Sequence, residues 1–193
     1  MGFWDFFEKG ICHILDPNGI DHMLFLISMA VVFIPSQWKS ILILATGFTI
    51  GHSVTLVAIT FDWFHIPSKW VEFGIPCTIL VTILANLAGI RRRKGMINLS
   101  VYFVLVTIFG LIHGMGFSPY LKMLIPKDES LTMPLVAFNL GVETGQIVFL
   151  LAFLVIQIVI HSLTRIKHRE WVIFVLGCTL SLTLLFISER FPW

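Results

Sequence analysis

Charged residues are scarce in this sequence. Lysine, arginine, aspartate and glutamate make up 12% of its 193 residues, and hydrophobic residues make up 57%. Soluble globular domains carry about 25% charged residues. The net charge of +2 comes without a basic stripe, so no nucleic-acid partner is expected. The composition excludes an ordinary soluble enzyme and indicates a polytopic membrane protein surrounded by the lipid bilayer.

Cysteine is also sparse. Cys12, Cys77 and Cys178 are far apart and form no Cys-x-x-Cys pair. This spacing excludes a disulfide framework and a thiolate metal site of the usual kind. The first ten residues lack the basic region and the small-residue cleavage site of a signal peptide. We therefore expect them to remain in the mature protein.

Long apolar stretches predict an all-α fold, a polytopic membrane helix bundle of about six transmembrane helices in a single domain over residues 1–193. Residues Phe3–Leu15 read as an N-terminal interfacial helix, and Asp16-Pro17-Asn18-Gly19 breaks it. This helix and the first span can together form one broken transmembrane element. The predicted spans cover approximately residues 19–34, 38–61, 70–90, 96–117, 133–163 and 171–187, with a polar loop at 118–131.

Basic residues gather in the loops on one side of this predicted bundle. They are Lys39, Arg91, Arg92, Arg93, Lys94, Arg165, Lys167 and Arg169. On the opposite side, basic residues are mixed with many acidic ones. The positive-inside rule therefore places both termini outside the cytoplasm, which means the periplasmic side of the inner membrane in a Gram-negative cell.

Five ionisable residues fall inside four predicted spans at compatible depths. Asp21 and His22 begin the first span on the outer side, and His113 lies near the outer end of the fourth. His52 and Glu143 lie about ten residues from a span end, or about 15 Å of helix. Such groups are costly to bury in a membrane, so together they indicate a functional site. Imidazole and carboxylate ligands without thiolates suit a divalent transition metal ion.

Supporting polar residues share helix faces with two members of this set. The faces are Thr49, His52 and Ser53 on one helix, and Asn139, Glu143 and Gln146 on another. Hydroxyl and amide side chains in membranes more often join helices than bind ions. Glu72, near the outer start of the third span, is expected to be an interfacial residue rather than a site member.

Each candidate also has a plain structural interpretation. A single intramembrane histidine can simply hydrogen-bond a neighbouring carbonyl, and we interpret His65, His161 and His168 as structural. Glycines accompany two of the candidate histidines: Gly47 and Gly51 form a GxxxG pair before His52, and Gly110 and Gly114 flank His113. Small residues of this kind predict close helix packing.

Four ordered motifs resemble the HupE/UreJ family of small membrane proteins. They are His13-Ile-Leu with Gly19-Ile-Asp-His-Met-Leu-Phe25, Phe48-Thr-Ile-Gly-His-Ser-Val-Thr-Leu56, Phe109-Gly-Leu-Ile-His-Gly-Met-Gly-Phe117 and Phe138-Asn-Leu-Gly-Val-Glu-Thr-Gly-Gln146. The resemblance implies a secondary nickel or cobalt permease. It also implies a metal-binding role for His13, Asp21 and His22, which match the family's histidine and Asp-His pair. His13 precedes Asp21 by eight residues, a longer spacing than the compact family form, which indicates a divergent branch.

Three functions are compatible with these residues, and whether the protein is an enzyme stays open. In a permease, the five ionisable residues would bind the ion, with His13 recruiting it at the mouth. In an intramembrane zinc-dependent hydrolase, three histidines would hold zinc and a water. Glu143 or Asp21 would then be the general base and Ser53 the oxyanion stabiliser, or Ser53, His113 and Glu143 would form a serine-type triad. In an accessory subunit the metal would be structural, and a homo-oligomer or a membrane partner is compatible with all three.

Overall fold

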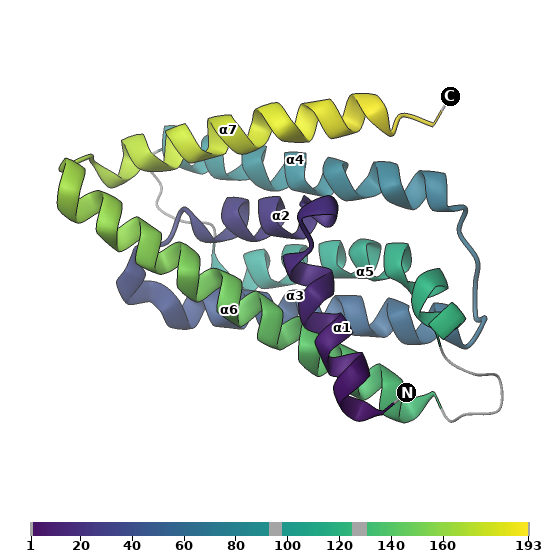
Figure 1. Cartoon of the computed structure of the whole chain (residues 1–193). Helices are drawn as coiled ribbons and strands as arrows, with labels where there is room; N and C mark the ends of the chain where they lie inside the picture. Colours follow the sequence, from purple (N-terminus) through teal and green to yellow (C-terminus); the bar gives the residue numbers. More distant parts are fainter. Residues whose placement is uncertain (1, 93–97, 125–130, 193) are drawn as a thin grey trace.

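The computed structural model describes residues 2–92, 98–124 and 131–192. These residues form α-helices and two short 3₁₀ helices and, within the described ranges, no strand (Figure 1). The helices are α1 (Phe3–Leu15), η1 (Pro17–Gly19), α2 (Asp21–Ala30), η2 (Pro35–Gln37), α3 (Trp38–Thr60), α4 (Ser68–Arg92), α5 (Leu99–Leu124), α6 (Thr132–Thr164) and α7 (His168–Glu189). The predicted all-α membrane helix bundle is confirmed.

Five helices of the described chain, α3 to α7, are long and apolar enough to cross a membrane. The predicted first span is shorter than expected. Helix α2 has ten residues, which cover about 15 Å, or half of a hydrocarbon core. It ends at Ala30 because the chain turns before Pro35, which holds Ile34 in an extended conformation. The described residues therefore contain five helices long enough to span a membrane, the half-length α2 and the 13-residue lead-in helix α1.

The remaining helices follow the predicted spans closely, with one extension. Helix α5 continues to Leu124, whereas the sequence predicted an end near Phe117. Residues 125–130 of the predicted polar loop lie outside the described residues. The same is true of Arg93 and Lys94 in the predicted basic loop. The start of α3, the end of α4 and the α6–α7 turn lie at one end of the bundle, away from both termini (Figure 1). Which side of the membrane this end faces stays a prediction.

Helices α3 and α5 touch backbone to backbone. A Cβ atom added to Gly51 would lie 2.0 Å from the carbonyl oxygen of Thr107. One added to Gly110 would lie 2.2 Å from the carbonyl oxygen of Phe48, and one added to Gly114 2.3 Å from that of His52. No larger residue fits at these positions, so the glycines permit the close packing that the sequence predicted.

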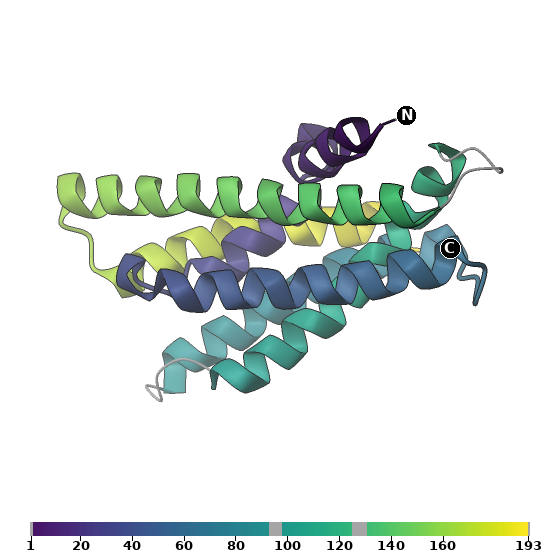
Figure 2. The same ribbon diagram turned by 90° about the horizontal axis from the view of Figure 1, so that it is seen from below.

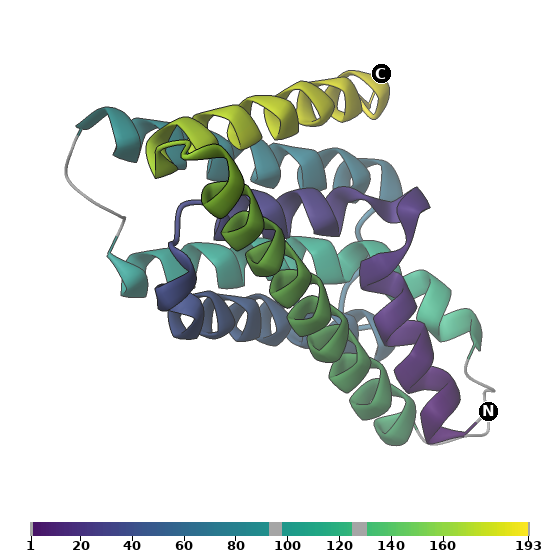
Figure 3. The same cartoon turned by 60° about the vertical axis from the view of Figure 1, so that its left-hand side comes forward.

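Helix α1 packs against α6 through a second glycine contact. A Cβ atom on Gly10 would lie 2.2 Å from the carbonyl oxygen of Phe138, and one on Gly141 2.1 Å from that of Phe7. Figures 2 and 3 show α1 alongside the first half of α6. Because of this contact, α1 buries one face in the protein and exposes Trp4, which is 73% accessible.

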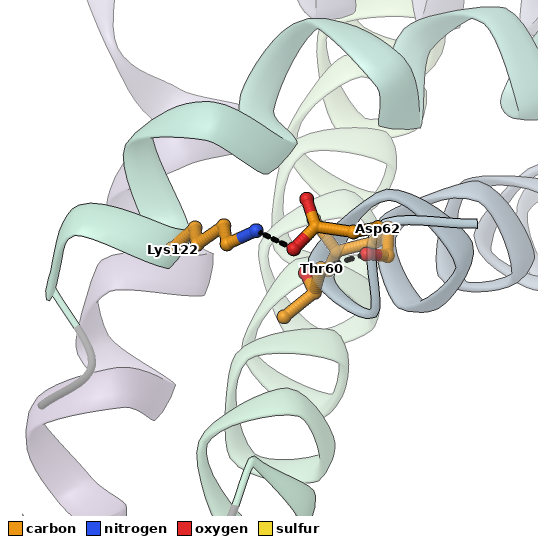
Figure 4. A network of polar contacts seen from close by, with 4 residues as sticks. Thr60, Asp62 and Lys122 are labelled. Atoms are coloured by element: carbon orange, nitrogen blue, oxygen red, sulfur yellow. Dashed lines mark hydrogen bonds and ion pairs between the residues drawn. The ribbon is translucent and has the colours of Figure 1, made fainter. Parts of the chain in front are cut away.

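An ion pair joins α3 and α5 beyond the glycine contact. Asp62, just after α3, pairs with Lys122 near the end of α5 (Figure 4). Asp62 has a left-handed backbone with φ of 58°, a conformation that aspartate tolerates better than most residues. Both side chains are exposed, so this pair contributes at most about 1 kcal/mol to stability. The glycine contact therefore dominates the pairing of α3 and α5.

We expect Gly51→Ala to lower the stability of the protein by about 1–3 kcal/mol, the usual cost of overpacking. The added methyl group would meet a backbone oxygen, which cannot rotate away as a side chain can. Thermal unfolding of the purified protein in detergent measures the change.

Gly177→Ala on α7 is the matched control, because a Cβ atom there has no neighbour within 4 Å. It should leave the unfolding temperature unchanged or raise it slightly, since alanine favours helix more than glycine does. Equal losses in the two variants would contradict the proposed role of the α3–α5 contact.

Candidate metal centre

Three histidines from three helices meet inside the bundle. The ligand nitrogens of His13 (α1), His22 (α2) and His52 (α3) all lie within 4.8 Å of one another. Their ring centroids are 4.5 Å apart for His13 and His22, 5.8 Å for His13 and His52, and 6.4 Å for His22 and His52. Two imidazoles whose nitrogens bind one ion at 2.0–2.1 Å have ring centres roughly 5 Å apart. The three side chains are therefore close to the arrangement that a shared ion requires.

His113 on α5 lies next to this group. Its ring centroid is 5.2 Å from that of His22. Its Nδ1 lies 2.9 Å from the carbonyl oxygen of Phe109. A carbonyl only accepts, so Nδ1 carries the proton and Nε2 carries a lone pair. A backbone hydrogen bond that fixes the tautomer in this way is typical of histidines that bind metals.

Several ring nitrogens of the four histidines are buried without a hydrogen-bond partner in the described structure. They are Nε2 of His13, His22 and His113, and both nitrogens of His52, although the amide of Asn139 lies near His52. His22 is held by the backbone of Gly19, which leaves its Nε2 for another partner. Each buried polar atom without a partner costs about 1–3 kcal/mol. One divalent cation would satisfy several of these lone pairs at once.

Asp21 lies at the edge of the cluster and already has a cationic partner. Its Oδ2 accepts a hydrogen bond from Nη1 of Arg190 at 2.9 Å, while its Oδ1 is buried without a partner among the described residues. Asp21, His22, His113 and Arg190 line one cavity of about 280 Å³. Nothing in the local sequence pairs Asp21 with Arg190, because the two are 169 positions apart. Arg190 is therefore a site residue that the sequence did not predict.

Glu72 lines the same cavity from α4. The sequence predicted an interfacial residue, and the structure places this carboxylate at the wall of the cavity that contains His22 and His113. The carboxylates of three residues and one guanidinium thus line the cavity, at the bundle end where α7 terminates: Asp16, Asp21, Glu72 and Arg190.

Glu143 occupies a different place from the histidines. Its Oε1 accepts a hydrogen bond from Thr46 at 2.7 Å, and it lines a groove between α3 and α6 with Thr49 and Asn139. It is not part of the histidine group within 4.8 Å. Its Oε2 is buried with no hydrogen-bond partner in the described ranges. Thr46, one turn before the predicted polar face of α3, was not singled out by sequence reasoning.

The supporting polar residues pair with one another across α3 and α6. Thr49 donates to Oε1 of Gln146 at 3.1 Å, and Ser53 donates to Oδ1 of Asn139 at 2.7 Å. These bonds join the two helices beside the histidine cluster. Their geometry matches the interhelical role that such residues commonly have in membranes.

A larger hollow leads from the surface toward the histidines. It has a volume of about 890 Å³ and is lined by Asp5, Glu8 and Cys12, with Lys9 as the cationic residue. It shares His13, Asp16 and Phe117 with the smaller cavity. The ring of Phe117 lies 4.1 Å from that of His13. His13 therefore stands between the surface hollow and the buried cluster.

Comparison with known proteins connects this geometry to a family. Searches of curated proteins and of solved structures find no match. The profile of the family described as "HupE / UreJ protein" matches residues 1–190, which is nearly the whole chain. The five membrane-length helices are consistent with this match. The chain therefore belongs to the HupE/UreJ family of membrane proteins.

Proposed function

We propose that this protein is a membrane permease for a divalent transition-metal ion of the nickel or cobalt type. One observation carries the proposal: ring nitrogens of His13, His22 and His52 converge within 4.8 Å from three separate helices. Each of these side chains has at least one buried nitrogen without a partner in the described structure. The association of the HupE/UreJ family with nickel and cobalt transport supports the same assignment.

The ligand set suits an ion that must be bound and then released. Neutral imidazoles prefer borderline metals such as nickel, cobalt and zinc. No carboxylate joins the three histidines within 4.8 Å, and Asp21 is held by Arg190. Because the ligands bring no net negative charge, binding is weaker than in a carboxylate-rich cage, as transport requires.

The surface hollow provides an entry route. Asp5, Glu8 and Asp16 line it, and carboxylates in a cleft concentrate cations near its mouth. His13 is the first imidazole on this route, with His22, His52 and His113 behind it. With the orientation expected from the basic loops, the hollow opens to the periplasmic side of the inner membrane.

A zinc-dependent hydrolase is the second candidate, favoured by Oδ1 of Asp21, which has no hydrogen-bond partner among the described residues. Asp21 lines the cavity with His22 and His113, and its carboxylate could take a proton from a water on zinc there. Ser53 and Glu143 are less suitable for catalysis, because Ser53 donates to Asn139 and Glu143 is bonded to Thr46. In this alternative the ion is a resident cofactor instead of a substrate.

We expect His22→Ala and His52→Ala each to lower the affinity for nickel or cobalt at least about tenfold, because each removes one of three converging ligands. Equilibrium dialysis of the detergent-purified protein without chelator, followed by mass spectrometry of the metal, measures binding. His65→Ala is the matched control, because His65 is exposed in the α3–α4 connection. Unchanged binding in His22→Ala and His52→Ala would show that these are not the ligands.

Transport is tested with the wild-type protein in proteoliposomes. We expect uptake of nickel or cobalt above that of empty liposomes, and we expect His13→Ala to reduce it because His13 connects the hollow to the cluster. Stoichiometric zinc that stays bound, with no uptake of any ion, would favour the hydrolase or an accessory subunit with a structural metal.

Arg190→Gln should tighten metal binding several-fold. The substitution removes a positive charge from the cavity and leaves the Asp21 carboxylate without its cationic partner. Calorimetric titration with nickel compares this variant with the double variant Asp21→Asn, Arg190→Gln, in which the gain should disappear. Weaker binding in Arg190→Gln would mean that the ion pair supports the site instead of competing with the ion.

A further inference from the structure

The C-terminal end of α2 lies among buried residues, and Val31, which follows it, is fully buried. The last four carbonyl groups of any helix lack donors from a following turn, so here the protein must supply them. Backbone amides supply two of the donors, those of Val31 and Phe33. The other two carbonyls, of Ser28 and Met29, accept hydrogen bonds from side chains of other helices.

Asn86 on α4 and Tyr102 on α5 provide these side-chain donors. Nδ2 of Asn86 donates to the carbonyl oxygen of Ser28 at 2.8 Å and to the hydroxyl of Tyr102 at 3.1 Å. The hydroxyl of Tyr102 donates in turn to the carbonyl oxygen of Met29, 3.5 Å away. Both side chains are almost fully buried. The amide and the phenol therefore bond two neighbouring carbonyls of α2 and also bond each other.

A second amide and a second ring, on α6 and α7, bond the next carbonyls in the same way. Nε2 of Gln157 donates to the carbonyl oxygen of Phe33 at 3.1 Å and lies 3.5 Å from Nδ1 of His168. Nε2 of His168 lies 3.2 Å from the carbonyl oxygen of Val32. A carbonyl only accepts, so Nε2 of His168 carries the proton and Nδ1 accepts from the amide. All of these polar contacts are therefore mutually consistent.

We propose that four side chains, which we call the α2 clamp, fix the position of α2 and thereby of His22: Asn86, Tyr102, Gln157 and His168. They come from four different helices, and all four donate to carbonyls at one end of α2. Directed bonds from four neighbours oppose both rotation of α2 and its sliding along its axis. The inference rests on the proposed function, because His22 is one of the three converging ligands.

Helix α2 needs such bonds because it lacks the contact that holds the other ligand-bearing helices. Helix α1 packs through Gly10 and α3 packs through Gly51, each against a backbone oxygen of its partner. Helix α2 contains no glycine. Hydrogen bonds between side chains and other helices are the remaining specific attraction between helices in a membrane.

The helix transmits this restraint from one end to the other. Val32 follows His22 by ten residues, or about 15 Å of helix. Phe25 and Met29, between them, are fully buried, and closely packed interiors transmit displacement. A metal ligand must lie within about 0.2 Å of its proper distance. A small shift of α2 at the clamp would therefore move His22 out of register with His52.

The first test measures metal binding by the full-length protein in detergent. Asn86→Leu and Gln157→Met remove the amide donors and keep side chains of similar length, and Tyr102→Phe removes only a hydroxyl. We expect each to weaken nickel or cobalt binding about three- to tenfold, less than the roughly 10- to 100-fold lost with a hydrogen-bond partner of the ligand itself. With Co²⁺ as the probe, the visible absorption bands should change, because they report the geometry of the ligands.

Thr183→Val on α7 is the matched control. The hydroxyl of Thr183 is fully buried and bonds the carbonyl oxygen of Thr179 in the same helix, so its removal takes away a buried hydrogen bond without touching α2. This variant should keep the wild-type affinity and Co²⁺ spectrum, whatever its unfolding temperature. A clamp residue that served stability alone would behave in the same way.

The second test uses no metal. Hydrogen exchange followed by mass spectrometry should show faster exchange at residues 24–27, beside His22, in Asn86→Leu and in Tyr102→Phe. Exchange in α6 should stay at the wild-type rate, and Thr183→Val should leave α2 unchanged. Tyr102→Phe keeps the aromatic ring, so it still tests the clamp if the amide substitutions prevent folding.

The outcomes separate the clamp from the proposed function. Clamp variants with wild-type affinity, an unchanged Co²⁺ spectrum and unchanged exchange would overturn the clamp, while wild-type binding that needs His22 and His52 would leave the metal site standing. If the wild-type protein binds no ion, the proposed metal site fails and exchange alone decides the clamp. Faster exchange that reaches residues 24–27 would then support it, and faster exchange confined to residues beyond Met29 would overturn it.

Discussion

The contact between α3 and α5 is the constraint on which the metal centre depends. Lipid provides little hydrophobic drive for one apolar helix to associate with another, so close van der Waals packing must hold membrane helices together. Gly51, Gly110 and Gly114 supply that packing by bringing backbone against backbone. Gly114, the residue after His113, packs on the carbonyl oxygen of His52. The same contact that joins the helices therefore holds His52 and His113 on facing helices, where the rings of both lie near that of His22.

The broken α1–η1–α2 element completes the centre from the other side. Pro17–Gly19 interrupts the helix, so the end of α1 and the start of α2 both point their side chains into the bundle. Asp21 lies in the first turn of α2, where the helix dipole favours a negative charge. Interrupted helices survive at membrane depth when they line a cavity or are buried in protein. Here the contact of α1 with α6 and the cavity at His22 meet that requirement.

Polar groups cluster at both ends of α2, and apolar side chains fill the space between them. Phe25, Leu26 and Met29 are fully or almost fully buried along this helix. Any route for an ion along α2 would have to cross this apolar layer. Transporters commonly solve this problem by moving one group of helices against another around a central site.

The sequence alone determined the membrane bundle, the lead-in helix Phe3–Leu15 and the close packing at its glycines, because hydrophobic runs and small-residue spacing are local signals. Ionisable residues in apolar spans stand out, so it also predicted one set of five candidate ligands: Asp21, His22, His52, His113 and Glu143. The resemblance also implied a role for His13, but only the tertiary structure showed how close its ring lies to His22, that Glu143 is hydrogen-bonded to Thr46, and that Arg190 pairs with Asp21. These contacts depend on how each helix is rotated and shifted against its neighbours, which local periodicity does not specify.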